Sequence, residues 1–318
     1  MKNKILAMLV AFGMVGSVSA IEINENLSIN GFIDGSLTQT DNDTSGKSAT
    51  YGPDEVEVDF LFNVGSVSGE LHIDDADSAG TSGLDIEHAH FTYSLENGIS
   101  ITVGRYGSAL GLEREDPSGL FSYSRAYGSS DFNLGNIDQG SVEGVALSYA
   151  AEAWSIGVSI ENASGNDLGN STTGADDADF EVALTYSGME NLALGGGFHS
   201  ENDGNQRDHW NINATYVVGK ALLGAEYTEM SPNAGNDRDA FLLLVDYDVS
   251  DKLGFVARYS SYDSATGTNA GNDVDTITIA PNYAITESLG AILEYSTTDN
   301  DTAGQDEDLI ALELTYTF

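Results

Sequence analysis

Three histidines occur in a pattern that could bind a metal ion or serve a catalytic nucleophile. His88 and His90 alternate along one predicted strand and so share a face, and His72 lies on the neighbouring predicted strand. Histidine is a frequent metal ligand and a common partner of a serine nucleophile. The surrounding sequence, however, specifies no nucleophile and no oxyanion hole. We therefore interpret these histidines as polar lining, and we predict no catalytic residue, no metal site and no cofactor.

Two acidic strings have a spacing that suits calcium. Residues 41–46 read Asp-Asn-Asp-Thr-Ser-Gly and residues 299–304 read Asp-Asn-Asp-Thr-Ala-Gly, so oxygen ligands recur at alternate positions. The glutamate that would close a twelve-residue calcium loop is replaced by Gly52 in the first string and by Ile310 in the second. Loose association with divalent cations stays open, but we favour ordinary solvated loops.

The elements that would position these residues are β-strands, because apolar and polar residues alternate through most of the chain. In residues 55–64, for example, Val56, Val58 and Phe60 alternate with Glu57 and Asp59. The repeating segments have the roughly 9 to 11 residues with which a tilted strand crosses a bilayer. The pattern predicts sixteen strands, near residues 27–37, 55–64, 67–74, 84–95, 99–110, 141–150, 153–162, 178–187, 191–200, 208–218, 220–229, 239–249, 252–262, 274–285, 288–297 and 308–318.

The connections alternate in length. Loops rich in Asp, Asn, Gly and Thr follow the odd-numbered strands, whereas turns of two or three residues, such as 151–152 and 219–220, follow the even-numbered ones. The longest connection, residues 111–140, follows the fifth strand. An even number of antiparallel strands with short turns on one side is typical of a bacterial outer-membrane barrel, with both termini on the periplasmic side.

Aromatic residues provide an independent test of this register. In a membrane barrel they should gather on the lipid face at the two interfaces. The tyrosines just before short turns are Tyr93, Tyr149, Tyr186, Tyr216, Tyr247, Tyr283 and Tyr316. The aromatic residues where long loops begin are Phe198, Tyr227, Tyr259 and Tyr295. This placement favours a barrel in lipid over a soluble β-sandwich, in which aromatics would be buried in mid-strand.

The amino terminus is typical of a secretory signal. Lys2 and Lys4 precede an apolar run from Ile5 to Val18, and the small residue Ala20 marks the expected cleavage site. We therefore predict that residues 1–20 are a signal peptide and that residues 21–318 form one outer-membrane barrel domain. The chain has no cysteine, so we expect neither disulfides nor thiol chemistry.

The chain is strongly acidic. Without Lys2 and Lys4, nine of the 11 basic residues remain against 51 acidic ones, so the formal charge is −42. Such a surface repels nucleic acid and attracts cations, although adaptation to a saline habitat explains the acidity equally well.

Many charges fall on the face opposite the apolar one. This face contains Glu55, Glu57, Asp59, Glu70, Asp74, Glu181, Glu226, Asp246, Glu294, Glu313 and the basic Arg258. In a dry core so many carboxylates would cost several kcal/mol each, so we expect a wet interior. Sixteen strands are also about the number at which a barrel keeps an aqueous bore. A plugged, solvated lumen is the alternative.

The last strand and the loop after the fifth strand resemble known features of general-diffusion porins of Gram-negative bacteria. Residues 309–318 alternate Ile310, Leu312 and Leu314 with polar residues and end on Phe318, which resembles the signal read by the barrel assembly machinery. Residues 89–93, Ala-His-Phe-Thr-Tyr, and residues 103–113, Val-Gly-Arg-Tyr-Gly-Ser-Ala-Leu-Gly-Leu-Glu, are similar to OmpL-like porins.

The resemblance implies that the third extracellular loop, residues 111–140, folds into the lumen and narrows it. It would supply the charged residues Glu113, Arg114, Glu115, Asp116 and Arg125. The family's Pro-Glu-Phe-type loop signature and its arginine ladder are missing here, which puts the transverse field of the family's pore in doubt. The resemblance also implies a homotrimer in contact with outer-membrane lipids and lipopolysaccharide.

These observations predict an outer-membrane channel for passive diffusion of small hydrophilic solutes and ions, with a preference for cations. The expected pore-lining residues are the five loop residues together with Glu57, Asp59, Glu70, His72, His88, His90, Glu181, Glu226, Arg258 and Glu294. A substrate-selective channel, for example for saccharides, is one alternative, and a barrel acting as adhesin or enzyme is another.

Overall fold

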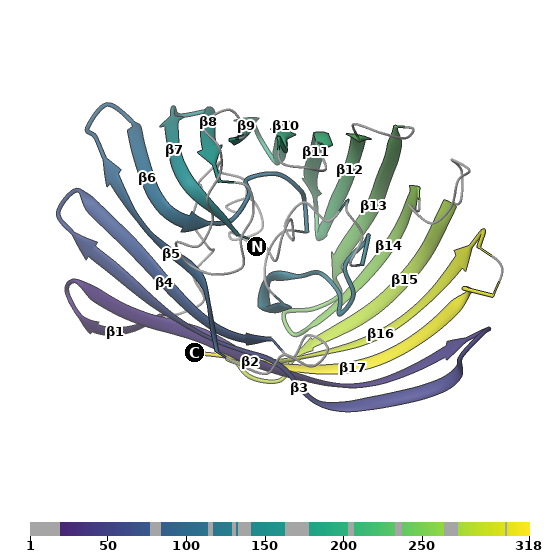
Figure 1. Ribbon diagram of the computed structural model, residues 1–318. Helices are drawn as coiled ribbons and strands as arrows, with labels where there is room; N and C mark the ends of the chain where they lie inside the picture. The colour runs from purple at the N-terminus through teal and green to yellow at the C-terminus, as the bar shows by residue number, and fades with distance from the viewer. Residues whose placement is uncertain are drawn as a thin grey trace.

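A closed antiparallel barrel makes up most of the chain (Figure 1). The structure is a computed structural model. It describes residues 20–76, 84–113, 117–128, 132, 141–162, 178–202, 207–232, 237–263, 273–302 and 304–318. The predicted signal peptide therefore lies outside the described residues, except for Ala20. No helix among the described residues is long and apolar enough to cross a membrane.

Sixteen strands form the wall. They are β2 (Leu27–Asn42), β3 (Gly46–Val64), β4 (Val67–Ala76), β5 (Asp85–Ser94), β6 (Ile99–Tyr106), β7 (Val142–Ala150), β8 (Trp154–Glu161), β9 (Asp179–Met189), β10 (Leu192–Ser200), β11 (Arg207–Val218), β12 (Ala221–Pro232), β13 (Arg238–Asp248), β14 (Leu253–Asp263), β15 (Asp273–Ala284), β16 (Leu289–Asn300) and β17 (Glu307–Thr317).

The last strand closes the barrel against the first wall strand. β17 pairs with β2 from Glu307 opposite Asn42 to Thr317 opposite Phe32. Phe318 extends this pairing, because its N–H donates to the Gly31 carbonyl at 3.1 Å and its carbonyl accepts from the Gly31 N–H at 3.2 Å. A Cβ on Gly31 would lie 2.9 Å from the Phe318 ring, so glycine leaves room for the terminal side chain. The predicted antiparallel barrel of sixteen strands is confirmed.

The predicted lipid face is the exposed face of the isolated chain. On β13, Leu242 and Leu244 are 0% and 2% exposed, whereas their neighbours Leu243 and Val245 are 54% and 39% exposed. Most of the tyrosines predicted at the two interfaces are exposed as well, including Tyr216 and Tyr316 near the short turns and Tyr227 and Tyr295 near the loops. Tyr186 and Tyr259 are half-buried. The alternation thus separates a band of apolar side chains that faces outward from an inward-facing set.

The structure corrects three details of the predicted strands. A short strand, β1 (Ile21–Asn24), precedes the barrel and pairs with β2, and the sequence did not predict it. The loop predicted at residues 38–54 is mostly strand, because β2 and β3 pair as far as Asn42 opposite Gly46. This part of the hairpin is largely exposed on both faces, so no apolar period marked it.

The tip of this hairpin is the first of the two acidic strings. Asn42 Oδ1 accepts hydrogen bonds from the backbone N–H groups of Thr44 and Ser45 at 3.0 and 3.1 Å, which closes the turn. Gly46 follows with a φ of 73°, which glycine adopts readily. The string therefore has a local structural role as a hairpin turn.

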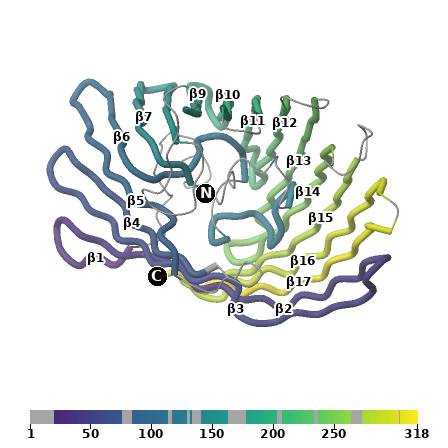
Figure 2. The backbone as a smooth tube through the Cα atoms, viewed as in Figure 1, coloured from purple at the N-terminus to yellow at the C-terminus, as the bar shows by residue number. Residues whose placement is uncertain are grey.

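The third correction concerns the strand predicted at residues 99–110, which ends at Tyr106. From there the chain leaves the wall and enters the ring of strands, where a short 3-10 helix, η2 (Pro117–Gly119), forms. The tube view shows this segment, coloured blue, inside the ring (Figure 2).

Candidate functional site

The inward-facing charges lie on a wall that is largely covered. Seven of the predicted inward-facing residues are buried: Glu57, Asp59, Glu181, Glu226, Arg258, Glu294 and Glu313. Glu55, Glu70, Asp74 and Asp246 are half-buried. Much of the cover comes from the segment after β6, whose described parts are residues 107–113, 117–128 and 132. The pore-lining residues predicted at Arg114, Glu115 and Asp116 lie outside the described residues.

Arg258 on β14 is the ionic centre of the contact between this segment and the wall. Its Nη1 donates to both carboxylate oxygens of Glu113, at 2.8 and 3.0 Å, and to the Ser124 carbonyl at 2.7 Å. Only 1% of the Arg258 side chain and 5% of the Glu113 side chain are exposed. Because the two charges are buried together, each compensates the other. The single arginine predicted to face the mid-lumen is therefore paired with Glu113.

Three wall carboxylates accept hydrogen bonds from the same segment. Glu181 on β9 accepts from the Ser108 hydroxyl at 2.6 Å and from the Ala109 N–H at 2.8 Å. Glu226 on β12 accepts from the Leu112 N–H at 2.5 Å. Glu294 on β16 accepts from the Ser124 N–H and hydroxyl at 3.0 and 2.6 Å. These carboxylates therefore satisfy backbone donors of a chain that has left the sheet.

Arg125, another residue of the predicted constriction, makes a hydrogen bond within this segment. Its Nη1 donates to the Glu113 carbonyl at 2.9 Å. The next residue, Ala126, donates its N–H to Glu113 Oε2 at 2.6 Å and accepts from the Ser260 hydroxyl at 2.7 Å. Glu113 thus joins both ends of the segment's inner part to the wall.

An apolar patch on the inner wall holds the rest of the segment. The wall contributes the buried residues Leu222, Met230, Ala240, Leu242, Leu244, Val256 and Ala280, and the segment contributes Ala126, Tyr127 and Phe132. The Tyr127 ring lies 6.4 Å from the rings of both Phe132 and Tyr262. Burial raises the pKa of the Tyr127 phenol, so this side chain adds no charge to the interior.

Sequence reasoning missed this patch, although the sequence contains its signal. Residues 241–245 read Phe-Leu-Leu-Leu-Val, a continuous apolar run in which both faces of the strand are apolar. Such a run indicates a strand that is covered on both sides. Here lipid is expected on one side, and the inward-folded segment covers the other.

A second group of charges surrounds His72 on β4. His72 Nδ1 lies 3.4 Å from Glu57 Oε1 and 3.5 Å from Asp59 Oδ1, and Nε2 lies 3.3 Å from Glu70 Oε2. The ring centroid of His88 is 4.6 Å from that of His72. His90 continues the row, with its ring centroid 6.3 Å from that of His88. The structure thus brings together the three histidines that the sequence singled out, with carboxylates around them.

Another histidine pair was not predicted. His199 on β10 lies opposite His209 on β11, and both side chains are buried. His199 Nε2 is 3.2 Å from Glu161 Oε2, and His209 Nε2 is 3.5 Å from Glu201 Oε1. Their positions on the polar face of two adjacent strands were the available signal, and it becomes visible only once the cross-strand register is known.

Comparison with known proteins gives a consistent result. The family model described as Gram-negative porin matches residues 6–303. OmpF of Salmonella typhi, solved with daunomycin, aligns at a TM-score of 0.70 with 15% identity, and the alignment covers 94% of this chain and 100% of that chain. The trimer form of OmpT, an outer membrane protein of Vibrio cholerae, aligns at a TM-score of 0.66 with 14% identity, covering 92% and 99%.

An anion-selective porin from Comamonas acidovorans aligns at a TM-score of 0.64 with 14% identity, covering 92% of this chain and 99% of that chain. At such identities these likenesses show the fold alone. No protein with a curated description matches the chain.

Proposed function

Because the chain belongs to the Gram-negative porin family, we propose that this outer-membrane barrel is a non-enzymatic channel through which small hydrophilic solutes and ions diffuse passively. The observation that best supports this function is a long connecting segment fastened inside a closed barrel of sixteen strands. The Glu113–Arg258 pair and the wall carboxylates hold that segment against the wall instead of leaving it outside. A segment held in this way narrows a bore without being part of the wall.

The part of the inner wall opposite the inward-folded segment determines the charge of the bore. In the barrel order, β4 and β12 are eight strands apart in a ring of sixteen, so they face each other across the interior. The segment covers the apolar patch on the β12 side, whereas the acidic and histidine residues from β3 to β5 face it from the opposite side. We infer that the half-buried carboxylates of this side, Glu55, Glu70 and Asp74, line the free part of the bore and give it a preference for cations.

The position of most aromatic residues on the lipid face favours general diffusion over saccharide selectivity. A saccharide channel would need a row of exposed rings on its inner wall for the solute to stack on. Among the described residues of the interior, the rings of Tyr106, Tyr127 and Phe132 are each less than 5% exposed, whereas Phe121, Tyr123 and Tyr262 are half-buried.

The proposed channel can be tested by reconstitution of the purified, refolded protein into planar bilayers and liposomes. Stepwise conductance in KCl and entry of small uncharged sugars into liposomes are expected, with a rate that falls steeply as the sugar grows. Folded protein that inserts into the bilayer but gives no conductance steps would overturn the channel assignment. Sugar entry that saturates with concentration would instead indicate a substrate-selective channel.

The proposed partners follow from the same setting. We infer a homotrimer embedded in outer-membrane lipid and lipopolysaccharide, and recognition of the carboxyl-terminal strand by the assembly machinery through Phe318. The OmpT neighbour was solved in a trimer form, which supports the trimer. Light scattering of the detergent-solubilised protein tests the oligomeric state, and deletion of Phe318 tests assembly in cells.

A further inference from the structure

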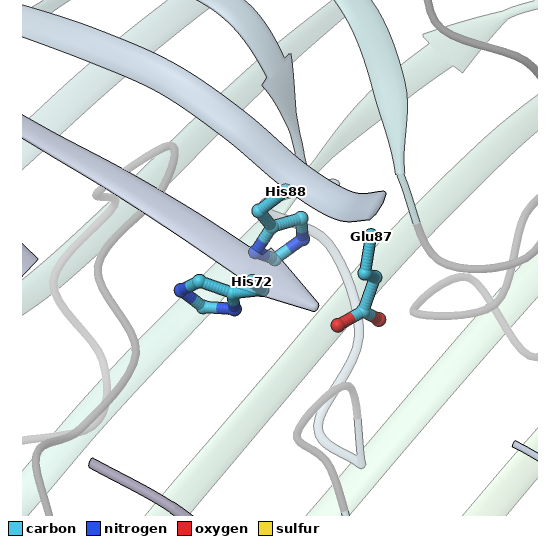
Figure 3. Close-up of side chains that lie close together, drawn as sticks. All are labelled: His72, Glu87 and His88. Atoms are coloured by element: carbon cyan, nitrogen blue, oxygen red, sulfur yellow. The ribbon is translucent and has the colours of Figure 1, made fainter. Parts of the chain in front are cut away.

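Three potential metal ligands converge on the inner wall where β4 meets β5. A ring nitrogen of His72, a carboxylate oxygen of Glu87 and a ring nitrogen of His88 all lie within 4.8 Å of one another. Figure 3 shows the two imidazoles one above the other, with the Glu87 carboxylate beside them. Glu87 and His88 are neighbours in sequence. The side chains of two such neighbours in a regular strand would point to opposite faces of the sheet.

An irregularity in the β4–β5 pairing brings the two neighbours together. Leu71 is opposite Ala89, but Ile73 is opposite Ile86, so Glu87 and His88 together face the single residue His72. This is the geometry of a β-bulge, in which one extra residue changes the direction of a side chain. Bulges are frequent beside functional sites for this reason. The bulge explains why the alternation of the sequence did not place Glu87 with the histidines.

Among the three residues, His88 has ring nitrogen atoms available for a ligand. His88 is 9% exposed, and neither of its ring nitrogens has a hydrogen-bond partner among the described residues. His72 is 0% exposed, and its nearest polar neighbours are the carboxylates at 3.3 to 3.5 Å. Buried polar atoms normally have partners, so the ring nitrogens of His88 beside the Glu87 carboxylate can accept an ion or a water as their partner.

The surroundings suit a cation held by histidine. Glu57 and Asp59 on β3 approach His72 Nδ1, and Glu70 approaches Nε2, so carboxylates flank both sides of the ring. A carboxylate at the ring nitrogen that does not bind the ion orients a ligating imidazole and increases its basicity. The carboxylates also supply the negative charge that a divalent ion requires. Glu70 and Glu87 are not fully buried, so an ion can reach the group from the lumen.

We propose that His72, Glu87 and His88 bind a first-row divalent transition-metal ion, for which Zn²⁺ is the best match. Zn²⁺ accepts two imidazoles and one carboxylate and leaves its fourth position to water, whereas Ca²⁺ and Mg²⁺ prefer oxygen ligands alone. Ligand atoms around tetrahedral Zn²⁺ are about 3.4 Å apart at bonds of about 2.1 Å. Side-chain rotations that move the three ligand atoms by about an ångström therefore bring them to the separation that Zn²⁺ requires. The site depends on the fold of the barrel and not on ion flow through it.

Zinc binding is measured directly by calorimetry on the refolded, detergent-solubilised full barrel, titrated with ZnCl₂ in the presence of excess CaCl₂. We expect one Zn²⁺ per chain in the original protein and at least a tenfold weaker affinity in His88→Gln and in Glu87→Gln. His209→Gln is the matched control, because it removes one buried histidine from β11 and should leave the affinity unchanged. Co²⁺ in place of Zn²⁺ should give visible absorption bands that the His88→Gln protein loses.

Folding of each variant is checked by its heat-dependent shift in gel mobility. If His72→Gln does not fold, His88→Gln and the half-buried Glu87→Gln still decide the question. Absence of saturable zinc binding to the folded protein would overturn the site. So would an affinity of His88→Gln and Glu87→Gln equal to that of the original protein, or displacement of the zinc by calcium. Because none of these measurements involves ion flow, their failure is distinct from failure of the proposed channel.

Discussion

Arg258 and Glu113 form a buried ion pair between the wall and the inward-folded segment. Removing one partner of a buried pair leaves the other charge without compensation, which costs about 3 to 5 kcal/mol. The Arg258 guanidinium also donates to Ser122 and Ser124 of the segment and to Thr278 of the wall. The pair is therefore expected to be strongly coupled energetically.

A double-mutant cycle measures this coupling. Arg258→Gln and Glu113→Gln should each lower the free energy of unfolding by roughly 3 to 5 kcal/mol, and the double variant should lose at least about 1 kcal/mol less than the two losses together. Urea unfolding from lipid vesicles supplies the values. The exposed pair Lys47–Asp41, at 3.1 Å, is the control and should show a coupling of about 0 to 1 kcal/mol. Additive losses at Arg258 and Glu113 would contradict a role of the pair in anchoring.

For single residues, the sequence predicted which side chains face the interior better than it predicted which atoms they contact. The alternation placed Glu57, Asp59 and His72 on one face, and the structure brings them together. It did not show that Glu181, Glu226 and Glu294 hold backbone donors of another segment, because those donors are far away in sequence. It also missed Glu87, because an inserted residue in a strand changes its face without changing its composition.

The strands are the elements whose prediction succeeded most fully, because each one has a lipid face and an inner face. The period of two therefore repeats in nearly every wall strand, and the aromatic residues mark both interfaces. The hairpin tip formed by β2 and β3 has no such contrast, and its strand structure could not be read from apolar residues. The apolar run on β13 is apolar on both faces, because the inward-folded segment covers its inner face and lipid is expected on its outer face.

The register of the strands can be tested with two arginine substitutions on nearby strands. Leu243 is exposed on the outer face. Asn213 lies on the inner face close to it, because β11, β12 and β13 pair Asn213 with Glu226 and Glu226 with Leu242. Leu243→Arg should destabilise the barrel by roughly 2 to 4 kcal/mol near the bilayer midplane. Asn213→Arg should change stability by less than about 1 kcal/mol, since a wet interior tolerates charge.

Urea unfolding in vesicles of one lipid composition gives both values, and the original protein is the reference. Equal sensitivity at the two positions would mean that the assigned lipid face is wrong. The opposite order, with Asn213→Arg the more damaging, would mean that the interior at this level is dry.

The segment between β6 and β7 differs from the other connections in its length and in its anchors. If its inner part narrows the bore, replacing residues 111–140 by a short turn should raise single-channel conductance and admit larger sugars. The cause is the removal of the residues that cover the inner wall at Glu226, Leu242 and Arg258. Planar-bilayer recordings in KCl and sugar entry into liposomes give the two readouts. Unchanged conductance in a folded variant would show that the segment does not determine the narrowest point.

For the molecule as a whole, fold and family do not determine which ions pass. The fold is shared with a porin described as anion-selective, so selectivity has to follow from the charges that line the bore of this chain. Charges on exposed loops are screened beyond about 8 to 10 Å at physiological ionic strength, so most of the formal charge of −42 without Lys2 and Lys4 has little influence on an ion inside the barrel. The inner wall is different, because every permeating ion passes close to it.

The wall charges predict cation selectivity. The single arginine among the predicted inward-facing charges, Arg258, is bound by Glu113, whereas Glu70 and Asp246 are carboxylates that remain partly exposed. Across a KCl gradient the zero-current potential should therefore have the sign of K⁺ permeation and should shrink as salt rises. The double variant Glu70→Gln, Asp246→Asn should reduce it, and Asp43→Asn, Asp301→Asn, an equal change of charge at exposed positions, should not. A potential of the chloride sign would show that these carboxylates do not line the path of the ions.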